Sequence, residues 1–187
     1  MKIINSNKQG YTLLELIVSM SIITLLTGLF LANYHNSNQR TDLVMTAQTM
    51  VADFRYAQAN ALGLVKYDGE SPAGGWGILV TSDPSQYHNY FIFADQNDDG
   101  YYNDNESLES LGGRVITLPK NIYIESLTLD GVDKAKAVVT FLPPDPITRI
   151  HAYNATGTVL EIKLKELVNN TTKTVRVNFL GLVEVID

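Results

Sequence analysis

The chain has 187 residues, of which 45% are hydrophobic and 18% are charged, a composition that fits one globular domain with an additional element. It contains no cysteine, which excludes disulfides, thiolate metal sites and a cysteine nucleophile. The formal net charge of -6 at pH 7 gives no overall attraction to nucleic acid or to anionic lipid, so either partner would need a local basic patch.

Residues 1–10 carry two lysines and no acid, and a long apolar segment follows them. Within it, residues 16–34 form an uncharged run of 19 residues, which as a helix is long enough to cross a bilayer core of about 30 Å. The lysines predict that the N-terminal end stays in the cytoplasm and that the rest of the chain lies outside. A cleaved secretory signal fits less well, because its apolar region spans about 7 to 15 residues and ends in a small-residue cleavage site that residues 31–33 lack.

One carboxylate, Glu15, lies at the edge of this apolar segment. An unpaired carboxylate near lipid tails costs on the order of a few kcal/mol, so a partner is expected. If the chain were cut between Gly10 and Tyr11, the new amino group would lie four residues before Glu15, about one helical turn away. Its positive charge could then pair with the carboxylate of its own chain or of a neighbour.

The stretch from Gly10 to Glu15, GYTLLE, with an uncharged segment after it, resembles the prepilin motif G-F-T-L-x-E of type IV pilins and type II secretion pseudopilins. The resemblance implies that a prepilin peptidase cleaves after Gly10 and methylates Tyr11, and that Glu15 is needed for assembly into a filament. Tyr11 departs from the usual phenylalanine. The alternative is an ordinary signal anchor that happens to contain a glutamate.

An amphipathic helix is predicted to follow, since apolar residues recur at spacings of three and four. They are Leu43, Val44, Ala47, Met50, Val51, Phe54, Ala57 and Ala61. No proline interrupts residues 11–62, so the two segments can form one continuous helix that ends at Gly63. The expected organisation is a cleaved leader at 1–10, a transmembrane and assembly helix at 11–34, an amphipathic helix at 35–62 and a β-rich globular head at 63–187.

From residue 64 the apolar period changes to two, which predicts short antiparallel strands. We expect strands at 76–81, 90–94, 114–118, 123–129, 137–142, 158–165, 174–179 and 182–185. Asn169 and Asn170 mark a hairpin turn, and the prolines between 143 and 146 break any regular element. The predicted fold class is therefore α+β, with the long N-terminal helix packed on an antiparallel sheet, as in the pilin fold.

Looser features of the head resemble the FimT-like and H-type branch of minor pilins. They are Arg55 in the helix, the Gly75–Trp76 pair, the acidic segment 93–106 and the strand turn 175–181. Trp76 is expected to be a core aromatic whose neighbouring glycines allow close approach of the backbone.

Residues 95–106 fit the twelve-residue calcium loop D-x-[DN]-x-[DN]-G-x5-E. The expected ligands are Asp95, Asn97, Asp99, Tyr101 through its carbonyl, Asn103 directly or through water, and Glu106 with both carboxylate oxygens. Gly100 would permit the sharp turn. The flanks predict a strand and no helix, so this would be a single loop on a β-rich head. The same sequence also fits an acidic Asp-Gly turn that only keeps the surface soluble.

Neither catalysis nor nucleic-acid binding is predicted. His35, His88 and His151 belong to no metal or triad spacing, and each is expected to be a surface or hydrogen-bonded side chain. Residues 163–176 hold four basic side chains against Glu166, a local excess of three that could touch DNA phosphates. However, residues 181–184 read GLVE and lack the Gly-Arg-x-Arg of DNA-binding FimT-like minor pilins, so nucleic acid is not the expected partner.

The resemblance thus implies a minor pilin or pseudopilin and no enzyme. Its expected location is the inner membrane, as a single-pass protein with a cytoplasmic N-terminus, and then a filament shared with other pilins. Two alternatives stay open: a stationary membrane-anchored, calcium-binding adhesive ectodomain, and a DNA-binding minor pilin for DNA uptake. The sequence does not indicate which machine the chain serves.

Overall fold

The computed structural model describes residues 11–102, 114–143, 147–152 and 155–187, and the side chains at 32–39 are left aside. The chain divides into two compact units, Met1–Asn38 and Gln39–Asp187, and the second is called the head unit here. A single helix, α1, is assigned to Leu13–Leu62. It ends where the sequence predicts, since the amide of Gly63 donates to the carbonyl of Ala59 at 2.8 Å and Leu64 then adopts a φ of 49°.

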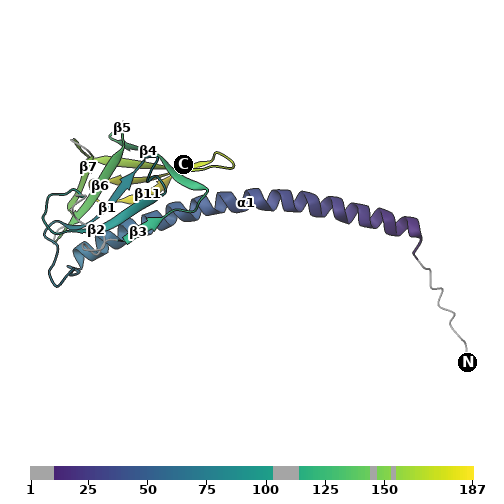
Figure 1. The fold of residues 1–187 in the computed structure, drawn as a ribbon, viewed down its shortest axis with the longest axis horizontal. Coiled ribbons are helices and arrows are strands. Elements are labelled where there is room, and N and C mark those ends of the chain that lie inside the picture. Colours follow the sequence, from purple (N-terminus) through teal and green to yellow (C-terminus); the bar gives the residue numbers. More distant parts are fainter. Residues whose placement is uncertain (1–10, 103–113, 144–146, 153–154) are drawn as a thin grey trace, which may run out of the picture. The chain divides into compact units, whose positions relative to one another are not determined.

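Eleven strands form two antiparallel sheets in the described part of the head unit (Figure 1). The six-stranded sheet has the order β3-β2-β1-β6-β7-β8. Its strands are β1 (Gly75–Thr81), β2 (Asn89–Asp95), β3 (Arg114–Thr117), β6 (Lys136–Leu142), β7 (Ile147–Ala152) and β8 (Ala155–Gly157). The five-stranded sheet has the order β11-β10-β9-β4-β5. Its strands are β4 (Ile122–Leu129), β5 (Val132–Lys134), β9 (Val159–Glu166), β10 (Thr172–Asn178) and β11 (Val183–Ile186).

The α+β class is confirmed, and each of the eight predicted strands is present within two residues of its expected bounds. The sequence missed β5, β7 and β8. Two of these have only three residues, too few to show an alternating pattern, and the prolines before β7 favoured an irregular segment. The division into two sheets was also missed, because alternation within a strand does not indicate its pairing partners.

One hydrophobic core joins the head-unit part of α1 to both sheets. Of the eight apolar helix residues expected to face it, seven are buried, and Phe54 and Met50 are completely inaccessible. The prediction was wrong for Val44, which is exposed at the edge of the buried face. The helix also contributes a polar side chain to this interior, since Asp53 is buried and accepts a hydrogen bond of 2.5 Å from the Tyr90 hydroxyl on β2.

The six-stranded sheet is covered on its second face as well. Leu79, Phe91, Phe93 and Val138 form a small separate cluster there, and the ring of Tyr102 packs against it. Consequently β1 is buried along its whole length and shows no alternation. Trp76 is a core residue as predicted, and its indole Nε1 donates to the carbonyl of Val65 at 3.2 Å.

Candidate functional site

The start of α1 is built around Thr12 and Glu15. The amide of Glu15 donates to the Thr12 hydroxyl at 3.2 Å, and the amide of Leu16 donates to the Thr12 carbonyl at 3.2 Å. Thr12 is therefore the N-cap, and Thr-x-x-Glu is the capping-box pattern. The positive end of the helix dipole favours a carboxylate at this place. The capping role of Thr12 and Glu15 was not predicted, although a threonine followed three residues later by a glutamate before an apolar run is the sequence pattern of a capping box.

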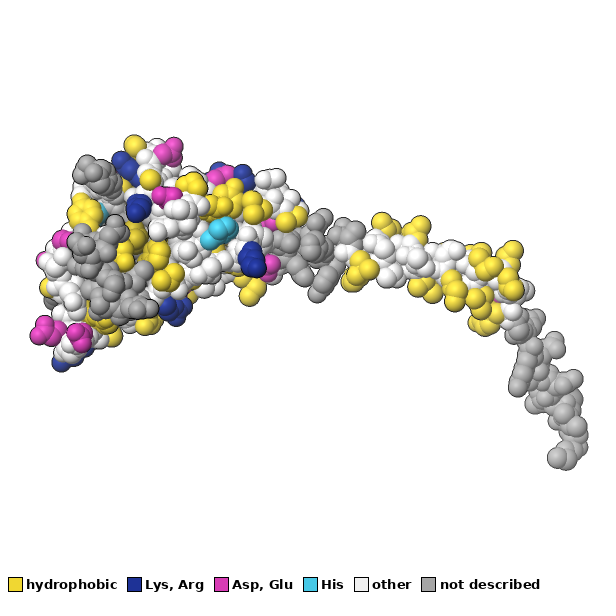
Figure 2. All heavy atoms as spheres, in the orientation of Figure 1, with side chains coloured by type: hydrophobic (Ala, Val, Ile, Leu, Met, Phe, Trp, Pro, Cys, Tyr) yellow, Lys and Arg dark blue, Asp and Glu magenta, His cyan; other side chains and the backbone are white. Residues whose placement is uncertain are grey.

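An apolar surface surrounds the following helical turns. Leu13–Leu31 is the one described helical segment that is long and apolar enough to cross a membrane, with a mean hydropathy of 2.1 and none of it buried. Figure 2 shows apolar side chains along the described turns of this segment, whereas charged side chains are spread over the head unit. Such a surface is unfavourable in water, and the length and apolarity of the segment suit a lipid environment or packing against other apolar helices.

The hydroxyl groups within this segment are all satisfied by the helix itself. Ser19, Ser21, Thr24 and Thr27 each donate to the carbonyl four residues earlier, over 2.7, 2.9, 2.8 and 2.7 Å respectively. An unsatisfied hydroxyl is costly in hydrocarbon, and these internal bonds remove that cost. The segment can therefore enter lipid or a dry helix bundle without needing polar partners for these side chains.

The predicted processing residues surround this helix start. Gly10 lies outside the described residues, while Tyr11 lies two positions before the first residue of α1 and is 85% exposed. Glu15 is exposed in the first turn of the helix. Cleavage before Tyr11 would thus remove no residue of α1 and would leave the cap at Thr12 in place.

A second candidate site begins at Asp95, the last residue of β2. This side chain is buried, and its Oδ2 accepts a hydrogen bond of 2.9 Å from the Gly100 amide, which closes a loop over residues 95–100. Among the described residues its other oxygen, Oδ1, has no hydrogen-bond partner. Burial raises the pKa of Asp95, as do the nearby charges of Asp99 and Asp98, and the backbone amides of Gly100 and Asp98 act in the opposite direction.

The polar side chains within the loop hold its backbone. Asn97 Oδ1 accepts from the Asp99 amide at 3.2 Å, and Asp99 Oδ1 accepts from the Tyr101 amide at 2.8 Å. Gly100 has a φ of 72°, the left-handed region in which glycine is favoured. Asp98 differs from its neighbours, because its carboxylate is paired with the Arg149 guanidinium of β7 at 2.7 Å.

Aromatic rings anchor the end of this loop on the six-stranded sheet. Tyr102 stacks on Phe91 with a centroid distance of 6.2 Å, and the Tyr101 ring lies 5.1 Å from the His151 ring. Within the described part of the chain neither ring nitrogen of His151 has a hydrogen-bond partner, so the expectation of a surface or hydrogen-bonded histidine was wrong there. Burial lowers the pKa of His151, and the Arg149 charge adds to this. His88 does fit its expectation, with Nδ1 2.8 Å from the Ile122 carbonyl.

The structure brings Asp95, Asn97, Asp99 and Tyr101 into one loop. The other two predicted calcium ligands, Asn103 and Glu106, lie outside the described residues. Over the described ranges, no group of three or more histidine and acidic side chains is gathered closely enough to hold a metal ion. A metal in this loop would thus depend on the Asn97 amide and the Tyr101 carbonyl as well as on carboxylates.

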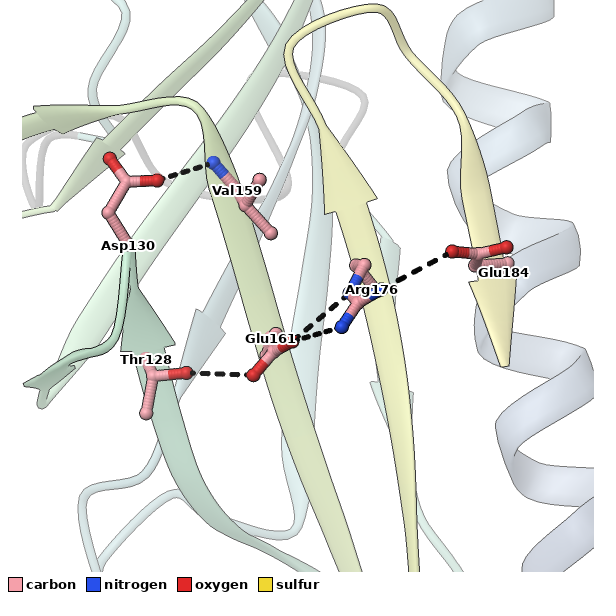
Figure 3. A network of polar contacts seen from close by, with 6 residues as sticks. All are labelled: Thr128, Asp130, Val159, Glu161, Arg176 and Glu184. Carbon is pink, nitrogen blue, oxygen red and sulfur yellow. Dashed lines mark hydrogen bonds and ion pairs between the residues drawn. The ribbon is translucent and has the colours of Figure 1, made fainter. Parts of the chain in front are cut away.

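The basic residues of the β9–β10 hairpin are paired with acids on neighbouring strands and at the C-terminal residue, Asp187. Arg176 lies 2.8 Å from Glu161 and 3.8 Å from Glu184, and Figure 3 shows this ladder crossing β9, β10 and β11. The remaining pairs are Lys163–Glu125 at 3.2 Å, Lys165–Glu125 at 2.7 Å and Lys173–Asp187. The hydrogen bond from Lys165 lowers the pKa of Glu125. The excess of three positive charges counted along the sequence is therefore offset by acids that the fold places beside them.

Comparison with known proteins identifies the N-terminal segment. Residues 5–31 match the prokaryotic N-terminal methylation motif. This motif indicates a type IV pilin-like prepilin that is processed by a prepilin peptidase, and the proteins that carry the motif are structural. No curated protein and no solved structure matches the chain. The match covers residues 5–10 and the apolar part of α1 and does not extend into the head unit.

Proposed function

We propose that the chain is a minor pilin or pseudopilin, a subunit of a type IV pilus-like or type II secretion filament. The observation that carries the proposal is the coincidence of two features at residues 5–31. The methylation motif matches there, and the same residues contain the capped start of a helix whose apolar surface is exposed in the single chain. A separate head unit with its own core follows, as a filament subunit requires.

Processing would occur between Gly10 and Tyr11, with methylation of the new Tyr11 amino group. Because Tyr11 and Thr12 precede α1, cleavage before Tyr11 would leave the helix unchanged. The lysines of the leader, Lys2 and Lys8, keep the N-terminus in the cytoplasm. The apolar segment then holds the subunit in the inner membrane with the head unit outside.

Cleavage changes the electrostatics of the helix start. Before it, the N-terminal amides and the Thr12 cap provide the favourable environment for the Glu15 carboxylate. After it, an ammonium group lies about one turn from Glu15, at the end of the helix where a positive charge is unfavourable. A carboxylate from the same chain or from a neighbouring subunit relieves this repulsion, and apolar packing between helices supplies the remaining contacts.

Filament isolation tests the proposal. Filaments sheared or extracted from cells that express the chain should contain the processed form, detectable with an antibody to the head unit. A stationary membrane-anchored ectodomain would stay entirely in the membrane fraction. Membranes from the same cells serve as the control, because both functions predict the chain there before assembly.

A further inference from the structure

Asp95 contains a buried oxygen that the protein does not satisfy. The residue is only 1% exposed, and within the described chain Oδ1 accepts no hydrogen bond. Leaving a buried carboxylate oxygen unpaired is costly, and in native proteins such groups commonly indicate a water or an ion. None of the ion pairs of the described residues involves Asp95, and Arg149 pairs with Asp98 instead.

The carboxylate of Asp95 is turned into the loop that follows β2. Its Oδ2 is held by the amide of Gly100, five residues further along, so the whole carboxylate lies within the turn closed by residues 95–100. A side chain at Gly74 would collide with this carboxylate, since a Cβ there would lie 2.1 Å from Oδ2 and 2.8 Å from Oδ1. The backbone at Gly74 thus lies against one side of the Asp95 carboxylate, and the loop over residues 95–100 lies against the other.

Further oxygens lie at alternate positions of the same loop. Asn97 Oδ1 and Asp99 Oδ1 accept hydrogen bonds from the backbone amides of Asp99 and Tyr101, which hold both side-chain oxygens in place within the turn. The Tyr101 carbonyl follows two residues later. Calcium takes six to eight oxygen ligands at about 2.3 to 2.6 Å, from carboxylates, amides, carbonyls and water, whereas zinc and copper favour nitrogen and sulfur.

We propose that this loop binds a calcium ion through Asp95 Oδ1, the side-chain oxygens of Asn97 and Asp99, and the carbonyl of Tyr101, with water in further positions. The inference involves only the head unit and does not depend on assembly into a filament. Binding would fix the end of β2 relative to Tyr101 and Tyr102, whose rings pack on His151 and Phe91.

Calorimetry tests the proposal on the full chain, purified in detergent and freed of metal. Titration with calcium chloride should give saturable binding with a dissociation constant of about 10⁻⁴ to 10⁻³ M, the range of extracellular calcium modules. Asp99→Asn should weaken this affinity by about tenfold or more, because it removes a charged ligand from an exposed position. Asp95→Asn should abolish binding. Magnesium should bind less well, since it demands a smaller octahedral site.

Asp98→Asn is the matched control. It removes the same charge from the same loop, but its carboxylate is directed to Arg149, and asparagine tolerates its φ of 57°. The affinity of this variant should stay within about threefold of that of the unmodified chain. No saturable binding at millimolar calcium would overturn the proposal. Equal weakening of the calcium affinity by Asp98→Asn and Asp99→Asn would also overturn it, because it would mean that calcium is attracted to the acidic surface in general and not to specific ligands. Thermal unfolding verifies that each variant is folded. If Asp95→Asn does not fold, the comparison of Asp99→Asn with Asp98→Asn decides the test.

Discussion

The amide of Glu15 donates a hydrogen bond of 3.2 Å to the hydroxyl of Thr12, so the two polar residues of the GYTLLE segment are joined at the first turn of α1. The threonine fixes where the helix begins, and the glutamate occupies the turn in which a negative charge is most favourable. Glu15 can therefore be tolerated before cleavage, and its carboxylate is available to pair with a new amino terminus after cleavage.

Replacing Glu15 by glutamine separates assembly from anchoring. Glu15→Gln keeps a capping-box residue of nearly the same shape but removes the charge. We expect the variant to be inserted and processed normally, and to be depleted in isolated filaments by about tenfold or more, since an ion pair in an apolar setting is lost. Immunodetection in membrane and filament fractions measures both quantities. Normal amounts of Glu15→Gln in filaments would exclude charge pairing as the assembly contact.

Tyr90 and Asp53 tie the six-stranded sheet to the helix inside the core. Burial raises the pKa of Tyr90 far above its usual range, so its hydroxyl stays protonated and donates to Asp53 at physiological pH. Tyr90→Phe removes this hydrogen bond from the buried carboxylate, whose other partner among the described residues is Arg114 at 3.7 Å. The variant should lower the free energy of unfolding by about 1 to 3 kcal/mol. Urea unfolding of the head unit measures this, with Tyr56→Phe on the exposed helix surface as the control. Equal stability of the two variants would contradict the assigned role of the bond.

Asp130 makes the stability of the head unit depend on pH. Hydrogen bonds from the Thr158 amide and hydroxyl, and from the Val159 amide drawn in Figure 3, lower the pKa of Asp130. A carboxyl whose pKa is lower in the folded state contributes stability above its unfolded pKa of about 3.9, and this contribution is lost as pH falls through the folded pKa. Asp130→Asn, which suits the local φ of 50°, should therefore be less stable than the unmodified chain at pH 7, with the gap closing toward pH 2.5. Urea unfolding midpoints of the variant and the unmodified chain at both pH values measure this difference. A difference in stability that widens in acid would contradict the assigned effect of Asp130.

The paired charges of the β9–β10 hairpin lead to a prediction about nucleic acid. Removing two of the acids with the double variant Glu125→Gln and Glu161→Gln leaves Lys163 and Lys165 without the partners they have in the fold. We expect this variant to shift double-stranded DNA in a gel at low salt, with the shift lost by about 0.2 M salt, whereas the unmodified chain does not shift it. If the unmodified chain binds equally well, the pairing does not suppress DNA binding.

Features encoded within a few consecutive residues were predictable from the sequence. The end of the helix follows from the apolar period and Gly63, and the eight strands follow from short runs of apolar and β-branched residues bounded by turn residues. The Gly10–Glu15 segment was recognised from residue types at fixed spacing, and the family comparison supports it. These signals are local, so no knowledge of distant contacts was needed.

Features that depend on contacts between distant segments were not predictable. The burial of Asp53 depends on β2, which places Tyr90 against it. Arg176 counts as part of a basic patch along the sequence, but β9 and β11 place Glu161 and Glu184 beside it. His151 is half-buried, and the loop after β2 places the Tyr101 ring against its imidazole. In each case the sheet pairing, which alternation does not specify, decides the environment.

The N-terminus of the protein in its native membrane tests the central claim most directly. Mass spectrometry of the purified chain should find a mature form that begins at Tyr11 and is heavier by one methyl group on its amino nitrogen. A chain that still begins at Met1 or Lys2, or that is cut elsewhere in the apolar segment, would contradict the assignment as a processed filament subunit.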